Sequence, residues 1–436
     1  MGAAQDVIRS IAAEETTVRE AVDAAIGRIE AGDAEVNAVV VRDFDRARLR
    51  ADALDRARAG GRTGALLGLP MTVKESYDVA GLPTTWGFEE HRSFVAGRDA
   101  RVVERLQAAG AVILGKTNVP PGLVDFQSSN PVYGATHNPR GHGRSSGGSS
   151  GGSAASVAAG FVTAEMGSDV GGSIRIPAAF CGVWGLKPTF DLVPRDGHSM
   201  PGTDGAHDLL SVAGPLAGSP EDLDLLLGVV ANHPLPEPTR RDLRGLRVAV
   251  MAEHPHAPVA ADVAATLRAT ADRLADAGAV VDDAPDLPDR AALGDLYLRM
   301  LTTVLSARMP DPDVEPIDVL TWFALLDDHA RHRRRWEAFL GGEGAADVVL
   351  SPVFSRTAFP LDDAEVTTRV LDVDGRATPA HTQLAWAALA TMTGMPAVAL
   401  PAGDGTDGLP IGLQLVGPRF TDRDLLRIAA LLGARR

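Results

Sequence analysis

Two clusters of glycine and serine mark the places where this chain could do chemistry. The first covers residues 147–153 (GGSSGGS), and the second covers residues 171–175 (GGSIR). A serine hydroxyl can act as a nucleophile or pass on a proton, and glycine lets backbone N–H groups approach a ligand closely. The two clusters therefore predict a cradle of backbone donors with hydroxyl groups directed into it.

Two simpler interpretations of these clusters are disfavoured. Glycine-serine runs are commonly flexible linkers, but residues 153–164 after the first cluster are small and apolar, and the second cluster continues into apolar residues such as Ile176 and Phe180. A phosphate-binding loop is also disfavoured, because no Gly-Lys-Ser/Thr follows the glycines and the pattern GxGxxG is absent. We therefore expect the clusters to lie between buried elements.

A serine nucleophile needs a base, and the residues offer two kinds. The pattern GxSxG occurs at residues 147–151, and the chain has 11 histidines, but no apolar strand precedes this pattern as a nucleophile elbow requires. Lys74 follows an apolar run at residues 66–73, and burial could lower its pKa from about 10.4. Lysine is, however, more commonly an exposed partner in an ion pair, so these residues alone leave the base open.

The hydrophobic pattern around these residues predicts an α/β fold, because helical and strand segments alternate. One helix start is well marked: Ser219 and Pro220 are typical of its cap and first position. Helices are expected at 3–31, 42–59, 99–110, 259–277, 378–393 and 421–432, and mainly helical structure at 289–340. Strands are expected at 66–73, 111–115, 246–251, 279–281, 346–350, 397–400 and 411–416.

We expect one large domain over residues 1–436, with residues 232–376 as a variable insertion or cap. The basic run RHRRRW at 331–336 could bind an anion, but beside Asp327 and Asp328 it is more typical of a solvated helix face. Large aromatic side chains mainly fill interiors, although some could line a pocket. The aromatic residues considered for this are Trp86, Phe126, Tyr133, Trp322 and Trp336.

Composition narrows the environment and the partners. The net charge of −15 disfavours nucleic acid and anionic membranes as partners. Cys181 is the sole cysteine, which excludes an internal disulfide and indicates a structural, buried thiol. No apolar run approaches the roughly 18 residues of a membrane span, and the N-terminus lacks a secretory signal core. We expect a cytoplasmic protein without metal or cofactor, and a homodimer stays open.

Several long motifs, in the same order, resemble those of the amidase signature family. They are GLPMTVKESYDVAGLPTT, GAVILGKTNVPP, GGSSGGSAASVAAG, GSDVGGSIRIPAAFCGVWGLKPT, TGMPAVALPAG and GLPIGLQLVGPRFTDRDLL. The resemblance covers roughly residues 66–228 and 378–433, and we recognise no family motif in residues 232–376. It implies an α/β fold with a large mixed central β-sheet flanked by helices on both faces.

The resemblance also implies a Ser–cis-Ser–Lys triad. Ser173 matches the nucleophile, Ser149 the bridging serine after a cis peptide bond from Gly148, and Lys74 the base. The oxyanion hole is implied at the backbone N–H groups of Val170, Gly171, Gly172 and Ser173. Supporting roles are implied for Ser150, Ser168, Asp169 and Arg175, where Asp169 braces the two loops and Arg175 supports that network.

Three activities are compatible with this triad. The first is hydrolysis of a small linear carboxylic amide through an acyl-enzyme on Ser173. The second is acyl transfer, in which an amine or alcohol replaces water as the acceptor. The third is that of a glutamine-hydrolysing amidotransferase subunit, which requires a partner enzyme. The residues do not identify the amide.

Overall fold

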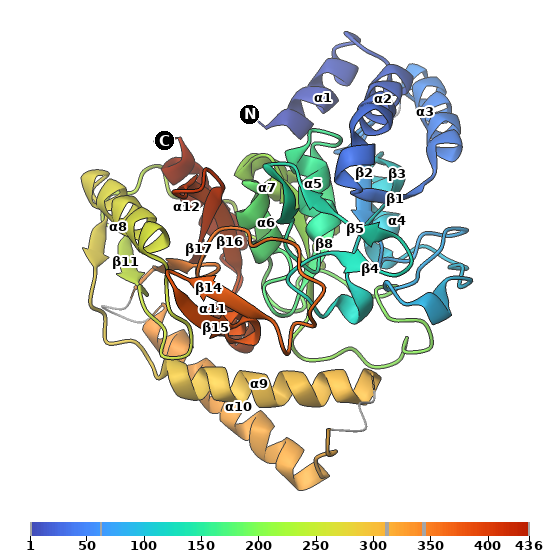
Figure 1. The fold of residues 1–436 in the computed structure, drawn as a ribbon. Helices are drawn as coiled ribbons and strands as arrows, with labels where there is room; N and C mark the ends of the chain where they lie inside the picture. The colour runs from blue at the N-terminus through green and yellow to red at the C-terminus, as the bar shows by residue number, and fades with distance from the viewer. Residues whose placement is uncertain (1, 62, 310–313, 342–345, 435–436) are drawn as a thin grey trace.

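An eleven-stranded β-sheet organises the computed structural model, which describes residues 2–61, 63–309, 314–341 and 346–434 (Figure 1). The strands follow one another across the sheet in this order: β1 (Val39–Arg42), β3 (Val112–Thr117), β2 (Pro70–Lys74), β8 (Ala164–Asp169), β10 (Val212–Ala217), β9 (Trp184–Lys187), β16 (Ala397–Asp404), β17 (Pro410–Val416), β13 (Val348–Pro352), β11 (Arg247–Val250) and β12 (Val280–Asp282). Parallel pairs join β3, β2 and β8 on one side and β13, β11 and β12 on the other, and the remaining pairs are antiparallel. The expected large mixed sheet is confirmed.

Helices cover both faces of this sheet, because alternate residues of a strand point to opposite sides. On β3, Ile113 packs into one hydrophobic cluster while Val112 and Leu114 pack into another. The first cluster includes residues of α4 (Arg101–Ala108), α7 (Pro220–Val230), α8 (Ala261–Asp276) and α12 (Asp422–Gly433). The second includes residues of α2 (Val18–Val36), α3 (Phe44–Ala59), α5 (Gly151–Ala158) and α6 (Arg175–Cys181).

Residues 232–376 contribute to the sheet and to a third layer. The strands β11, β12 and β13 extend one edge of the sheet. Two long helices, α9 (Arg290–Arg308) and α10 (Val319–Phe339), lie side by side away from α1–α3 (Figure 1). Together with α11 (Leu384–Thr393) they enclose a separate hydrophobic cluster around Trp336 and Trp386. This segment therefore supplies both an edge of the sheet and a helical layer against it.

Several predicted elements are confirmed with small shifts in their ends. The predicted start of α7 is correct, since the Ser219 hydroxyl accepts a hydrogen bond from the Asp222 N–H at 3.2 Å. The prediction at 66–73 is wrong in its first half, because residues 66–69 form turns and β2 starts at Pro70. Among the described residues, no helix combines the length and apolar character needed to cross a membrane.

Two predicted helices are wrong in their extent. The segment 3–31 is two helices, α1 (Ala3–Ala12) and α2, because Glu14 takes a left-handed φ of 59° and Thr17 starts α2 with a capping box. The segment 378–393 begins as the end of β15 (Arg376–Pro379), which pairs with β14 (Val370–Val373), and becomes α-helical only at Leu384.

We predict that Gly152→Ala lowers the free energy of unfolding by about 1–3 kcal/mol, the usual cost of overpacking. A Cβ on Gly152 of α5 would lie 2.3 Å from the backbone nitrogen of Asn118. The matched control is Gly27→Ala in α2, where a Cβ would meet nothing within 4 Å, and which should raise stability by about 0.5–1 kcal/mol. Urea denaturation of both variants checks this, and equal effects would contradict the close packing of α5.

Candidate active site

Lys74 is the last residue of β2, a strand that is buried at every position. Its neighbours in the sheet are β3 and β8, so the lysine side chain is enclosed and its exposed fraction is 0%. The Nζ atom lies 2.7 Å from Ser149 Oγ and 3.0 Å from Ser168 Oγ. The amine is therefore buried against two hydroxyl groups.

Burial lowers the pKa of Lys74 to about 7, because an ammonium group loses its hydration there. The carboxylates of Asp169 and Glu165 act in the opposite direction without cancelling this effect. Burial also raises the pKa of Glu165 to about 8, although hydroxyl groups of Thr72 and Thr117 donate to it. A large fraction of Lys74 is therefore an uncharged amine near neutral pH.

The chain contains three lysines, and all of them are fully buried. Burial lowers the pKa of Lys116 to about 8 and that of Lys187 to about 7, so a lowered pKa alone does not identify a base. Lys116 donates to the carbonyl of Pro83 and to the hydroxyl of Thr84, and Lys187 donates to its neighbouring carbonyl. Of the three, Lys74 is the one whose amine contacts Ser149.

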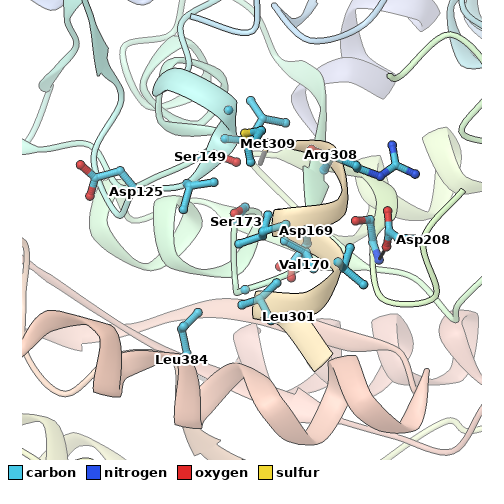
Figure 2. Close-up of a pocket in the computed structure, with 18 of the residues that line it drawn as sticks. Asp125, Ser149, Asp169, Val170, Ser173, Asp208, Leu301, Arg308, Met309 and Leu384 are labelled. Carbon is cyan, nitrogen blue, oxygen red and sulfur yellow. Dashed lines mark hydrogen bonds between the residues drawn. The ribbon is translucent and has the colours of Figure 1, made fainter. Parts of the chain in front are cut away.

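The two glycine-serine clusters meet at one cavity of about 530 Å³, which both Ser149 and Ser173 line (Figure 2). Ser149 lies just before α5 and Ser173 just before α6. The N–H of Ser150 donates to the carbonyl of Ser173 at 3.1 Å, which ties the two loops together. The Gly148–Ser149 peptide bond is cis, as the resemblance implied.

Asp169 ends β8 and holds the second cluster in place. Its carboxylate accepts the N–H groups of Gly172 at 2.9 Å and Ile174 at 3.1 Å. Arg175 donates to the same carboxylate through two nitrogens, at 2.8 and 3.0 Å, and this ion pair is fully buried. Burial alone would raise the pKa of Asp169, but the Arg175 guanidinium outweighs it and holds that pKa at about 2. Asp169 therefore stays charged across the working pH range.

The backbone between Asp169 and Ser173 is where the resemblance places the oxyanion hole. Gly172 has a φ of 94°, a conformation suited to glycine, and its N–H points to Asp169 rather than into the cavity. Val170 and Gly171 line the cavity together with Ser173. The hydroxyl of Tyr297, on α9, donates to the Val170 carbonyl at 2.7 Å and fixes this backbone from the other side.

The partner of Ser149 is a lysine, and the serine–histidine contact beside the cavity involves other residues. His198 lines the cavity, and its Nε2 lies 2.9 Å from the hydroxyl of Ser76. Burial lowers the pKa of His198 to about 3, so this imidazole is neutral. The GxSxG pattern at 147–151 therefore brings Ser149 to Lys74 and not to a histidine.

Of the aromatic residues considered as pocket candidates, two line the cavity and two belong to the hydrophobic cluster that α9, α10 and α11 enclose. Trp86 and Phe126 line the cavity, whereas Trp336 is fully buried in the helical cluster, with Trp322 packed at its edge. Tyr133 donates to Glu75 at 3.3 Å. In the basic run, Arg331 pairs with Asp328 at 2.6 Å on an exposed helix face, as expected.

Sequence reasoning missed much of the cavity wall. Leu298, Leu301, Leu305 and Met309, from α9 and the residue after it, line the cavity, and so does the ion pair of Arg195 and Asp208. These residues lie outside the recognised motifs. An apolar stripe in a helix could have indicated the α9 residues, whereas no signal in the sequence marked Arg195 and Asp208. Among the described residues, no group of three or more His, Cys, Asp or Glu side chains is arranged to hold a metal ion.

The comparison with known families agrees with this fold. A family model described as Amidase matches residues 20–312 and 319–426. The chain belongs to the amidase signature family.

Relatives within the family differ in the activities that their names give. The chain is 32% identical to the 1-carboxybiuret hydrolase subunit AtzE of Pseudomonas sp. (strain ADP). This match covers 98% of this chain and 97% of that protein. The chain is 34% identical to a glutamyl-tRNA(Gln) amidotransferase subunit of Anaeromyxobacter sp. (strain K), over 97% and 94%. A solved 6-aminohexanoate cyclic dimer hydrolase, complexed with substrate, superposes with a TM-score of 0.82 at 27% identity, over 100% of this chain and 97% of that one.

We predict that Asp169→Asn lowers the free energy of unfolding by about 3–5 kcal/mol, because it leaves Arg175 as a buried charge without its partner. Asp328→Asn is the matched control: it breaks an aspartate–arginine pair that is half exposed and should cost less than about 1 kcal/mol. Denaturant unfolding at pH 7 measures both. Similar losses of unfolding free energy in the two variants would contradict a stabilising role for the buried Asp169–Arg175 pair.

The stabilising effect of the Asp169–Arg175 ion pair decreases at acidic pH. The pKa of Asp169 is depressed in the folded state, so its stabilising effect is fully present above the unfolded pKa of about 3.9 and is lost as the pH falls toward 2. The stability difference between the wild type and Asp169→Asn should therefore shrink below about pH 4.

Proposed function

We propose that this protein hydrolyses a carboxylic amide through an acyl-enzyme on Ser173. The observation that carries the proposal is the 2.7 Å contact between the buried amine of Lys74 and the hydroxyl of Ser149, beside a cavity that Ser149 shares with Ser173. A base of this kind must be uncharged to work, and the pKa of Lys74 near 7 supports this. Membership of the amidase family supports the amide bond as the target.

The acylation step then runs as a proton relay. The Lys74 amine takes the proton of the Ser149 hydroxyl, Ser149 takes that of Ser173, and the Ser173 oxygen attacks the amide carbon. The N–H groups of Val170, Gly171 and Ser173 stabilise the oxyanion, whereas that of Gly172 first has to leave Asp169. When the C–N bond breaks, the proton returns from Lys74 through Ser149 to the leaving nitrogen.

Deacylation uses the same groups in the same order. Water enters in place of the amine, gives its proton through Ser149 to Lys74, and attacks the ester carbon of acylated Ser173. The C–O bond to Ser173 breaks, and the serine oxygen regains a proton from the relay. The products are a carboxylic acid and an amine, and the enzyme returns to its starting state.

We predict that Ser173→Ala lowers kcat/KM for a hydrolysed amide by at least about 10³-fold and that Lys74→Ala lowers it by about 10²–10⁴-fold. Ser146→Ala is the control, at the residue directly before the first glycine-serine cluster. The Ser146 hydroxyl is buried and has no hydrogen-bond partner among the described residues, so its loss should change kcat/KM less than twofold. A hydrolysis screen over aliphatic and aryl amides, with mass detection of the acyl group on Ser173, measures these effects.

We also predict an acidic limb in the pH profile. Lys74 is protonated below its pKa of about 7 and then cannot accept a proton. Log kcat/KM should therefore rise by about one per pH unit up to pH 7 and level off above it. A profile that is flat between pH 5 and 8 would rule out Lys74 as the base.

The similarity to the glutamyl-tRNA(Gln) amidotransferase protein supports a second candidate, a glutamine-hydrolysing subunit of a complex. This alternative predicts glutaminase activity that depends on a co-purifying partner. Acyl transfer predicts that conjugates form in preference to the free acid when a simple alkylamine or alcohol competes with water. Turnover of simple amides by the isolated chain, without conjugates, excludes both.

The proposal also covers the setting of the enzyme. Cys181 is a free, buried thiol, which suits a reducing compartment such as the cytoplasm. We assign the cap function within 232–376 to α9 and α10, whereas β11, β12 and β13 of the same segment belong to the central sheet. A homodimer acting on a small linear amide completes the proposal, and sedimentation analysis of the purified chain tests the dimer.

A further inference from the structure

The cavity wall formed by α9 carries a stripe of apolar side chains. Leu298, Leu301 and Leu305 recur at spacings of three and four residues, so they lie on one face of the helix, and all three line the cavity. Leu384, at the start of α11, continues this surface toward Gly171, where an added Cβ would lie 2.7 Å from the leucine. The substrate space next to the oxyanion backbone is therefore bounded by aliphatic side chains (Figure 2).

This helix is anchored at both ends of the cavity. Near one end, the Tyr297 hydroxyl donates to the carbonyl of Val170, next to the nucleophile loop. Just beyond the other end, Met309 packs on Gly122, where an added Cβ would lie 2.5 Å from the methionine sulfur. The helix thus spans the cavity as a fixed wall, and its apolar stripe has a defined position relative to Ser173.

The acidic side chains on the described part of the cavity wall are each paired within the chain. Three carboxylates line this part of the wall, and each forms an ion pair with an arginine: Asp169 with Arg175, Asp208 with Arg195, and Asp125 with Arg369. The other charged side chain of the described wall, Arg308, is a cation whose guanidinium donates to the carbonyl of Ala206. An ammonium group in this cavity would find no free carboxylate among these residues and would be repelled by Arg308.

We infer that the substrate is an amide with an apolar alkyl or aryl body and no ammonium group, and that the body packs against the leucine stripe of α9. This inference rests on the proposed amide hydrolysis and narrows its substrate class. It predicts that glutamine and other free α-amino acid amides are poor substrates, because their ammonium group meets no unpaired carboxylate on the described wall and lies in a cavity that Arg308 lines. A cavity of about 530 Å³ is within the range of small-molecule sites.

The first test compares substrates on the wild-type enzyme. The series of unbranched primary amides from acetamide to hexanamide, with phenylacetamide and glutamine, is assayed for released ammonia. We expect kcat/KM to rise about fourfold per added methylene, as expected when each methylene leaves water. Glutamine should be at least about 100-fold worse than hexanamide, because its ammonium group enters without a counter-ion.

The second test makes one side chain of the apolar stripe on α9 polar. Leu305→Gln keeps the size of a half-buried side chain and makes it polar, and we expect it to lower the ratio of kcat/KM for hexanamide over acetamide about five- to tenfold. Leu320→Gln on α10 is the matched control, because Leu320 is 78% exposed and is not part of the cavity wall. It should leave the ratio unchanged. Urea unfolding of both variants verifies that they are folded.

The outcomes separate this inference from the proposed function. Hydrolysis that depends on Ser173 but is equal for acetamide and hexanamide, or that prefers glutamine, overturns the substrate class and leaves the acyl-enzyme proposal intact. A chain-length preference that Leu305→Gln does not alter overturns the assignment to α9. If no amide is hydrolysed in a Ser173-dependent way, both proposals fail.

Discussion

The site depends on keeping one amine away from water without giving it a counter-ion in contact. Lys74 ends a strand that is buried throughout, so its ammonium form loses hydration, and its Nζ contacts two hydroxyl groups instead of a carboxylate. Glu165 lies on the adjacent strand, but its carboxylate is engaged by the hydroxyl groups of Thr72 and Thr117. A direct ion pair would have favoured the charged amine, so this arrangement of hydroxyl groups leaves a large fraction of the amine uncharged near neutral pH.

The sheet topology explains why distant segments meet at this amine. The strands β2 and β8 are parallel neighbours, so their carboxyl ends reach the same edge of the sheet. There, β2 delivers Lys74 and β8 delivers Asp169, while the loops before α5 and α6 bring in the two serines. The buried pair of Asp169 and Arg175 then connects β8 with the nucleophile loop. Each group is held by backbone that the core itself fixes.

The sequence indicated the candidate site better than it indicated the sheet. The motifs marked Lys74, Ser149 and Ser173, which the fold brings to one region: Lys74 contacts Ser149, and the two serines line one cavity. Ser219 marked the start of α7, because such signals are local. The strands β8, β9 and β10 were not predicted, since they are rich in glycine, small residues and buried polar groups and lack a strand pattern. The position of α9 in the cavity wall could not be predicted from the sequence. Its apolar stripe is that of any core helix, and only the tertiary fold places it at the cavity that Ser173 lines.

The burial of all three lysines has a practical consequence for handling this enzyme. The exposed cationic side chains on the described part of the chain are arginines, so reagents that acylate lysine find none of the three lysine amines at the surface of the folded molecule. Modification of the lysines would accompany opening of the core and would report unfolding rather than surface access. Coupling the native enzyme to a support through its lysines should be correspondingly inefficient.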